Sequence, residues 1–407
     1  MVTFMKIMFI TNASSMEGRA NIDIFLPAKE LMSKGYDVFL ISRKDIEGYQ
    51  TKCQGGSLSV YPLIPNLPFS YIYIPYLVIS ISRLIKELHP DLLVSDGDFG
   101  IPILTLFLEK LNRLPNIYLF REMTLENFYR YYKNPFIKLF GFVLSNVNHT
   151  IFRKSKYLLA IDRKIQSFYQ FELKRDDVKM INLLCVDMSD FKIDESISKI
   201  YRNKFGIAPN EVVLLYNGAM EPYRRIDLLI DAFSKLKKEY PYLRLVLSGL
   251  GVRDDSRNDL IENCQNLRLS DSVIFLEWLP REEMPKIISM ADICVDTYPK
   301  QAMTPSGKLI EWMASGKCIV SPSNPGDYLL KDGFNGILYS PGNGVELMQK
   351  LRPLIINKEL RDLLGTNARS TVETEFEVKN TVLLFEKFLQ GILSKPGVNN
   401  PDVEKDN

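Results

Sequence analysis

Short apolar runs alternate along this chain with longer segments in which apolar residues recur every three or four positions. The first cycle joins an apolar run at 6–11, a helical pattern at 22–33 and a second apolar run at 38–42. Strands separated by helices pair in parallel, and the helices cover both faces of the sheet. The alternation therefore predicts an α/β fold built on a doubly wound parallel sheet. Further strands of this series are expected at 92–95, 117–119 and 157–161.

The same alternation restarts after a polar, charged stretch at 190–204. Strands are expected at 212–217, 244–248, 273–276, 293–296 and 318–321, and helices at 225–239, 256–267, 282–290 and 308–314. We predict two doubly wound, Rossmann-like domains joined by a hinge near 187–196. The predicted parts are a domain over 1–190, a domain over 191–375, a helix over 376–393 that packs on the body, and a disordered tail over 394–407. Ligands of such sheets bind beyond the carboxyl ends of the strands, so we expect the site in a cleft between the domains.

Composition excludes several classes of function. Lys and Arg number 51 against 49 Asp and Glu, so no excess charge draws the whole chain to nucleic acid. The five cysteines lack the close spacing of zinc or redox motifs, and two histidines, His89 and His149, are too few for a His-rich metal site. No apolar run reaches the roughly 20 residues of a membrane span. We expect a reduced, cytoplasmic protein that binds neither nucleic acid nor a metal ion.

The segment 304–316, TPSGKLIEWMASG, carries the strongest chemical signal. Thr304 suits a helix N-cap and Pro305 the first helical position, so a helix should begin in the loop after the strand at 293–296. Its free amide groups and dipole would favour a diphosphate, which the small residues Ser306 and Gly307 would let approach closely. Glu311 lies roughly 10 Å further along the same face, where it could accept the hydroxyls of a ribose. On spacing alone, a helix that merely starts well explains the segment equally well.

This segment, with Lys317-Cys318-Ile319-Val320-Ser321 after it, resembles the nucleotide-sugar motif of the group 1 glycosyltransferases, retaining enzymes of family 4 with the GT-B fold. Other motifs of that family have similar strings here, in the same order: Gly35-Tyr36-Asp37-Val38, Val186-Asp187 with Phe191, 226–230 with Ala232-Phe233, Ser248-Gly249-Leu250-Gly251, Ala291-Asp292-Ile293, and Asp332-Gly333 with Asn335-Gly336. The resemblance implies transfer of a sugar from a UDP- or GDP-linked donor to a glycan or lipid-linked acceptor, with retention of anomeric configuration. It implies a role in cell-surface polysaccharide or glycoconjugate synthesis, and neither metal ion nor other cofactor.

The resemblance also assigns roles by position. Glu311 matches the glutamate that holds the donor ribose, and Arg224, or Arg225 beside it, matches a basic residue at the donor diphosphate. Gly18 and Arg19 lie where the family has a glycine-bearing loop near the phosphates and the acceptor. The donor-binding residues implied in this way are Gly218, Arg224, Arg225, Gly249, Thr304, Pro305, Ser306, Gly307, Lys308 and Glu311.

Three positions depart from the family pattern. Met303 replaces the first motif glutamate, Ala219 replaces the arginine after Gly218, and Arg121-Glu122 stand where many members carry a histidine. Arg121 and Glu122, ending a predicted strand, are candidates to face the sugar or acceptor, and with Arg224 they form the candidate catalytic set. A surface ion pair is the alternative for the first two.

These departures keep two other functions open. A catalytically silent partner subunit that binds the nucleotide sugar is the main alternative, and a sugar-nucleotide epimerase is a weaker one. A nicotinamide oxidoreductase is disfavoured because no G-x-G-x-x-G follows the first strand. Aromatic and basic residues mix at 128–140 and 153–156, which suits contact with an anionic membrane at its inner face or with a lipid-linked acceptor; a wide buried helix face is the alternative.

Overall fold

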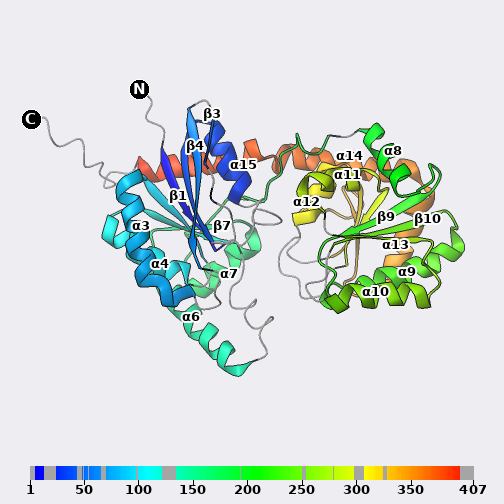
Figure 1. Cartoon of the computed structure of the whole chain (residues 1–407), viewed down its shortest axis with the longest axis horizontal. Helices are drawn as coiled ribbons and strands as arrows, with labels where there is room; N and C mark the ends of the chain where they lie inside the picture. Colours follow the sequence, from blue (N-terminus) through cyan, green and yellow to red (C-terminus); the bar gives the residue numbers. More distant parts are fainter. Residues whose placement is uncertain are drawn as a thin grey trace, which may run out of the picture. The chain divides into compact units, whose positions relative to one another are not determined.

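The structure is a computed structural model that divides into two compact units (Figure 1). It describes residues 5–12, 24–43, 48, 50–53, 55–65, 70–97, 100–121, 134–192, 194–249, 254–277, 279–297, 307–323 and 328–394. Unit 1 comprises Met1–Cys185 and Val378–Asn407, and unit 2 comprises Val186–Glu377. The boundary thus falls between 185 and 186, a few residues before the predicted one, and the last helix belongs to unit 1.

Within the described residues, the sheet of unit 1 has eight strands in the order β3-β4-β2-β1-β5-β6-β7-β8. The strands are β1 (Lys6–Ile10), β2 (Asp37–Arg43), β3 (Gln50–Cys53), β4 (Gly56–Ile64), β5 (Leu92–Asp96), β6 (Asn116–Phe120), β7 (Tyr157–Ala160) and β8 (Lys179–Met180). Neighbours pair in parallel except β3 with β4, which are antiparallel. The strand order reverses between β1 and β5, which defines the switch point of this sheet.

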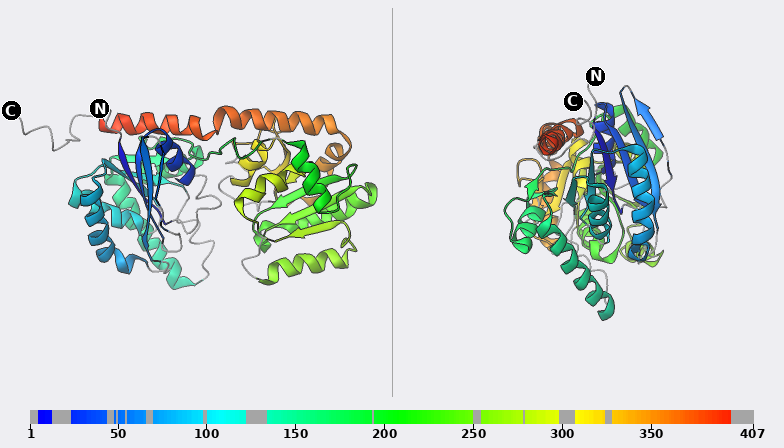
Figure 2. Two further views of the ribbon diagram at one scale, coloured as in Figure 1. Left: turned by 45° about the horizontal axis from the view of Figure 1, so that its top comes forward. Right: turned by 90° about the vertical axis from the view of Figure 1, so that its left-hand side faces the viewer.

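Helices cover both faces of this sheet (Figure 2). They are α2 (Leu26–Ser33), α3 (Ile74–Leu88), α4 (Ile101–Asn112), α6 (Pro135–Lys154), α7 (Arg163–Leu173) and α15 (Val378–Leu393). The predicted C-terminal helix is therefore present as α15, and it packs on unit 1: the Glu386 carboxylate accepts a hydrogen bond of 2.6 Å from the Tyr36 hydroxyl and pairs with Lys34 at 3.0 Å. Of the predicted tail, only Ser394 lies within the described residues.

Unit 2 has, in its described part, a six-stranded parallel sheet in the order β11-β10-β9-β12-β13-β14. The strands are β9 (Val212–Asn217), β10 (Leu243–Ser248), β11 (Val273–Leu276), β12 (Ile293–Val295), β13 (Cys318–Pro322) and β14 (Ile337–Tyr339). The helices are α8 (Glu195–Lys204), α9 (Ile226–Glu239), α10 (Asp254–Asn266), α11 (Met284–Ser289), α12 (Gly307–Ala314), α13 (Gly344–Ile356) and α14 (Lys358–Glu375), with 3-10 turns η3 (Pro222–Arg224) and η4 (Arg281–Glu283). Successive strands from β9 to β11 are added at one side of β9, and β12 is then added at its other side. The switch point of this sheet therefore lies between β9 and β12.

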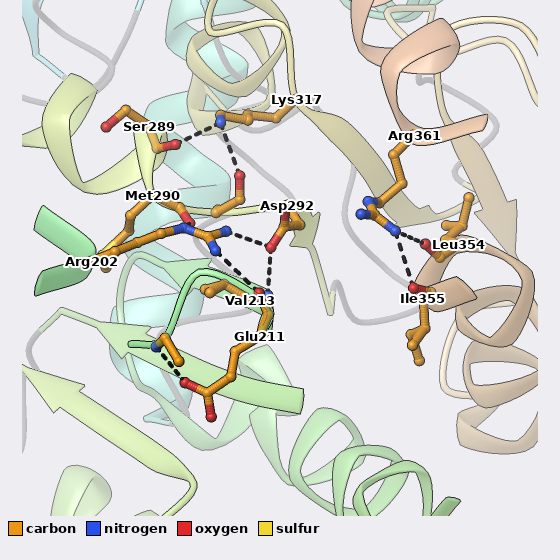
Figure 3. Close-up of polar contacts among 12 residues, drawn as sticks. Arg202, Glu211, Val213, Ser289, Met290, Asp292, Lys317, Leu354, Ile355 and Arg361 are labelled. Atoms are coloured by element: carbon orange, nitrogen blue, oxygen red, sulfur yellow. Dashed lines mark hydrogen bonds and ion pairs between the residues drawn. The ribbon is translucent and has the colours of Figure 1, made fainter. Parts of the chain in front are cut away.

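Partly buried charges anchor the amino ends of these strands (Figure 3). Arg202 of α8 donates hydrogen bonds to the Met290 and Glu211 carbonyls and pairs with Asp292 at 2.6 Å. Asp292 also accepts the amide of Val213 in β9 at 2.7 Å. Because one carboxylate joins a helix to two strand starts, the Ala-Asp motif before β12 has a structural role. The opposite, carboxyl edge of the sheet is left for a ligand.

Candidate functional site

Two glycine turns lie side by side at the carboxyl edge of unit 2. Gly218 follows β9 with φ of 136°, and Gly249 follows β10 with φ of 143°. The Gly218 amide donates a 2.9 Å hydrogen bond to the Ser248 carbonyl. A Cβ atom added to Gly249 would lie 2.0 Å from the Gly218 carbonyl oxygen. Both turns therefore need glycine. Because glycine has no side chain, a ligand at the switch point can approach the backbone of these turns closely.

Lys308, in the first turn of α12, brings a buried cation to the same place. Its amine pairs with Asp296 Oδ1 at 2.7 Å, and the two side chains are 9% and 1% exposed. The amine lies 3.9 Å from the centroid of the Tyr216 ring and 5.1 Å from that of Trp312. A Cβ atom on Gly218 would lie 3.8 Å from this amine, so Lys308 stands directly beside the first glycine turn.

Burial lowers the pKa of Lys308 to about 8. The Asp296 carboxylate acts in the opposite direction and raises that pKa, whereas the positive charge of Arg224 lowers it. The Arg224 guanidinium lies over the Tyr223 ring, 5.1 Å from its centroid. Arg224 and Lys308 thus act on each other, and together they place two positive charges at the switch point.

Arg225 has a different environment from Arg224. It adopts a left-handed conformation, with φ of 55°, as the residue before α9. Its guanidinium pairs with Asp227 at 3.0 Å, and both side chains are 45% exposed. Of the two arginines, Arg224 is therefore the one whose charge acts on Lys308.

Two neutral hydrogen bonds fix the rings beneath the Lys308 amine. The indole of Trp312 donates to Asn217 Oδ1 at 2.6 Å, and the Tyr216 hydroxyl donates to the Ala219 carbonyl at 2.9 Å. None of these four residues, Tyr216, Asn217, Trp312 and Asp296, was predicted from the sequence as a site residue. The signal that could have found Asp296 is a polar residue ending an apolar strand at the ligand-binding edge.

Glu311 is buried one turn further along α12. Its carboxylate pairs with Arg281 of η4 at 2.8 Å, with side chains 9% and 23% exposed for Glu311 and Arg281. Burial raises the pKa of Glu311, and the charge of Arg281 opposes that rise. Arg281 is a partner that no sequence motif indicated. Thr304, Pro305, Ser306 and the substituted Met303 lie outside the described residues, so α12 is described from Gly307 onward.

Unit 1 holds a separate polar cluster at its own switch point. Arg121, which follows β6, donates from Nε and NH2 to both carboxylate oxygens of Asp96, at 2.7 and 2.9 Å. The Thr11 hydroxyl donates to the same carboxylate at 2.7 Å. The side chains of Arg121 and Asp96 are 16% and 2% exposed, so this ion pair is largely buried. Glu122, Gly18 and Arg19 lie outside the described residues.

Comparison with known proteins identifies relatives of this chain. Residues 198–371 match the family model of the group 1 glycosyl transferases. An uncharacterized glycosyltransferase of Methanocaldococcus jannaschii is 24% identical over 261 residues, 63% of this chain and 64% of the relative. The alpha-monoglucosyldiacylglycerol synthase of Streptococcus pneumoniae is 25% identical over 324 residues, 76% of this chain and 69% of the relative. The first of these alignments thus spans a little under two thirds of the relative's length.

Solved structures extend the likeness to the whole chain. Anabaena HepE in complex with UDP and glucose matches with a TM-score of 0.74 and 18% identity, over 95% of this chain and 99% of that one. WaaG, a glycosyltransferase involved in lipopolysaccharide biosynthesis, matches with a TM-score of 0.69 and 16% identity, over 95% and 100%. The fold of two parallel-sheet units is therefore GT-B. The match to the group 1 glycosyltransferases thus covers residues 198–371 of this chain.

Proposed function

We propose that this chain transfers a sugar from a UDP- or GDP-linked donor to a glycan or lipid-linked acceptor, with retention of anomeric configuration and without a metal ion. The observation that carries the proposal is the pair of cations, Lys308 and Arg224, beside the glycine turns of unit 2. The positive charges at the start of α12 and the backbone amides of the glycine turns are groups that bind a diphosphate. HepE has been crystallised with UDP and with UDP-glucose, and WaaG acts in lipopolysaccharide biosynthesis, which supports a role in cell-surface polysaccharide or glycoconjugate synthesis.

In the proposed reaction, the bond between the anomeric carbon and the diphosphate oxygen breaks while a bond to an acceptor hydroxyl oxygen forms on the same face. The hydroxyl proton passes to the departing phosphate oxygen, so no separate general base is needed. Lys308 and Arg224 offset the negative charge that develops on the leaving diphosphate. Glu311 accepts hydrogen bonds from the ribose hydroxyls, and the charge of Arg281 favours the ionised form of this buried carboxylate.

A ligand that binds only the folded state raises the melting temperature, so a panel of UDP, GDP, ADP and CMP with their sugar conjugates tests the donor site. We expect one nucleotide and its sugar conjugate to stabilise the wild type, and Glu311→Gln to lose most of that stabilisation. Glu239→Gln is the matched control, because Glu239 forms an exposed pair with Arg352 at 2.7 Å in the same unit. No shift with any nucleotide would contradict the proposal. Stabilisation without transfer to any acceptor would favour the silent partner subunit instead.

Contact with a membrane surface through α6 is part of the proposal. This helix exposes an apolar stripe at helical spacing: Phe136 is 80% exposed, and Phe140, Val143 and Val147 continue the same face. Arg153 and Lys154 lie in its last turn. No helix in the described part of the chain is long and apolar enough to cross a membrane. An exposed apolar stripe beside basic residues suits a helix that lies on an anionic surface, where a lipid-linked acceptor would be presented.

A further inference from the structure

Asp296 is held rigidly at the carboxyl end of β12. It is completely buried, its amide donates to the Val320 carbonyl at 2.8 Å, and its carbonyl accepts the Tyr339 hydroxyl at 2.9 Å. Its Oδ1 pairs with the Lys308 amine at 2.7 Å and accepts a hydrogen bond of 2.8 Å from the Thr297 amide. Its Oδ2 accepts no hydrogen bond from the part of the chain that the structure describes. The backbone of Asp296 and one of its carboxylate oxygens are therefore fixed by neighbouring groups.

The groups around Lys308 come from three elements. Within the described residues, they are Asp296 and Cys294 at β12, Arg224 of η3, and the Tyr216 ring of β9. Burial raises the pKa of the Cys294 thiol far above its usual range, so this thiol is neutral. The Tyr216 hydroxyl is engaged with the Ala219 carbonyl. Among these groups, Asp296 supplies the negative charge that faces the amine.

From this geometry we propose that Asp296 is a positioning residue: it keeps the Lys308 amine protonated, and so sets the pH, in the mildly alkaline range, above which donor binding weakens. The inference rests on the proposed function, since it names how the donor site of unit 2 is tuned. Asp296 belongs to none of the sequence motifs, and in this proposal it does not contact the donor itself but acts on it through the charge of Lys308.

The direction of the pH effect follows from the charges. A diphosphate binds the protonated amine better than the neutral one, so binding weakens as the pH rises through the pKa of Lys308, about 8. Without the Asp296 charge, burial and the charge of Arg224 remain, and both lower the pKa of Lys308. The amine then loses its proton at a lower pH, so the loss of donor binding begins at a lower pH than in the wild type. Where the amine is protonated in both proteins, their affinities become similar.

The test measures the affinity for UDP-glucose and GDP-mannose by calorimetry from about pH 6 to about pH 9, where their diphosphates do not titrate. We expect wild-type affinity to be level near pH 6 and to fall above pH 8 by up to about tenfold per pH unit. Asp296→Asn should show the same fall from a lower pH, and Lys308→Met should bind weakly with no pH dependence. Asp362→Asn is the matched control, because Asp362 forms an exposed pair with Lys358 at 2.6 Å.

An equal loss of affinity at every pH in Asp296→Asn would overturn the inference, because a merely structural role gives no pH signature. Wild-type binding that is level across the range would also overturn it. If the wild type binds neither nucleotide sugar, the proposed function fails and the inference on donor binding fails with it. In that case NMR titration of 13Cε-labelled lysine, with Lys308 assigned by its loss in Lys308→Met, still reports whether Asp296 raises the Lys308 pKa. This measurement needs no donor, so the two failures are distinguishable.

Discussion

At the scale of single residues, the backbone conformation and close packing at Gly249 allow no residue other than glycine. Gly249→Ala would force a Cβ atom against the Gly218 carbonyl and hold alanine at φ of 143°, a region that L-residues rarely adopt. We expect a loss of about 2 kcal/mol or more in the free energy of unfolding, measured by urea denaturation. Gly391→Ala is the control, since nothing lies within 4 Å of its added Cβ atom in α15. An unchanged stability in Gly249→Ala would show that the two turns can move apart.

The pair of Arg281 with Glu311 gives a second prediction at this scale. Arg281→Ala leaves the Glu311 carboxylate buried without its cation, so we expect a loss of about 2 kcal/mol at neutral pH, less than for a fully enclosed pair because Arg281 is 23% exposed. Burial already raises the pKa of Glu311, and the variant raises it further. A raised carboxyl pKa means that the folded state binds the proton more tightly, so lowering the pH should restore part of the lost stability. Urea denaturation at neutral pH and near pH 5 measures both effects. Arg352→Ala, in the exposed pair with Glu239, should leave the free energy of unfolding essentially unchanged at either pH.

At the scale of elements, the sequence predicts continuous apolar strands well and polar strands poorly. The interior strand β9 and the edge strand β11 have the predicted bounds, because each is a continuous apolar run. β3, whose residues Gln50–Cys53 are all exposed, was missed since this edge strand has no apolar run. The start of α12 predicted at Thr304 and Pro305 lies outside the described residues, and the helix is described from Gly307 to Ala314. The burial of Lys308 could not be predicted, because a lysine in a first helical turn is typical of a solvated surface and only the tertiary packing of Asp296, Tyr216 and Trp312 encloses it.

α6 carries the prediction that belongs to this scale. If its apolar stripe contacts lipid, the double variant Phe136→Ser with Val143→Ser should lose most of its co-sedimentation with anionic vesicles, because about 1.5 to 3 kcal/mol of apolar burial is lost per large side chain. Neither residue is buried in unit 1, being 80% and 52% exposed, so folding should be unaffected. Leu383→Ser with Leu384→Ser on α15, at 44% and 56% exposure, is the matched control. Equal sedimentation of both double variants would remove α6 from membrane contact.

At the scale of the whole molecule, the chain enters unit 2 at Val186 and leaves it at Glu377, and these crossings are tied together. The Val186 amide donates to the Phe376 carbonyl at 3.0 Å, and Val186 and Glu377 form an isolated parallel bridge. Beyond that bridge, α15 belongs to unit 1 although it lies far from β1 in the sequence. The ring of Phe385 lies 6.4 Å from that of Phe9, and both residues are buried. Each unit is therefore built from its own core, and the units need not unfold together.

Phe385→Ala tests this division. Removing a fully buried ring should cost unit 1 about 3 to 5 kcal/mol of unfolding free energy while leaving the core of unit 2 intact. Hydrogen exchange followed by mass spectrometry should accordingly show faster exchange in β1 and β2 and unchanged exchange in β9 and β10. The neighbouring substitution Leu384→Ala, at a side chain 56% exposed, should change neither set. Faster exchange in β9 and β10 as well would mean that the two units unfold as one cooperative body, and the donor site would then share the stability of a helix that lies outside its own unit.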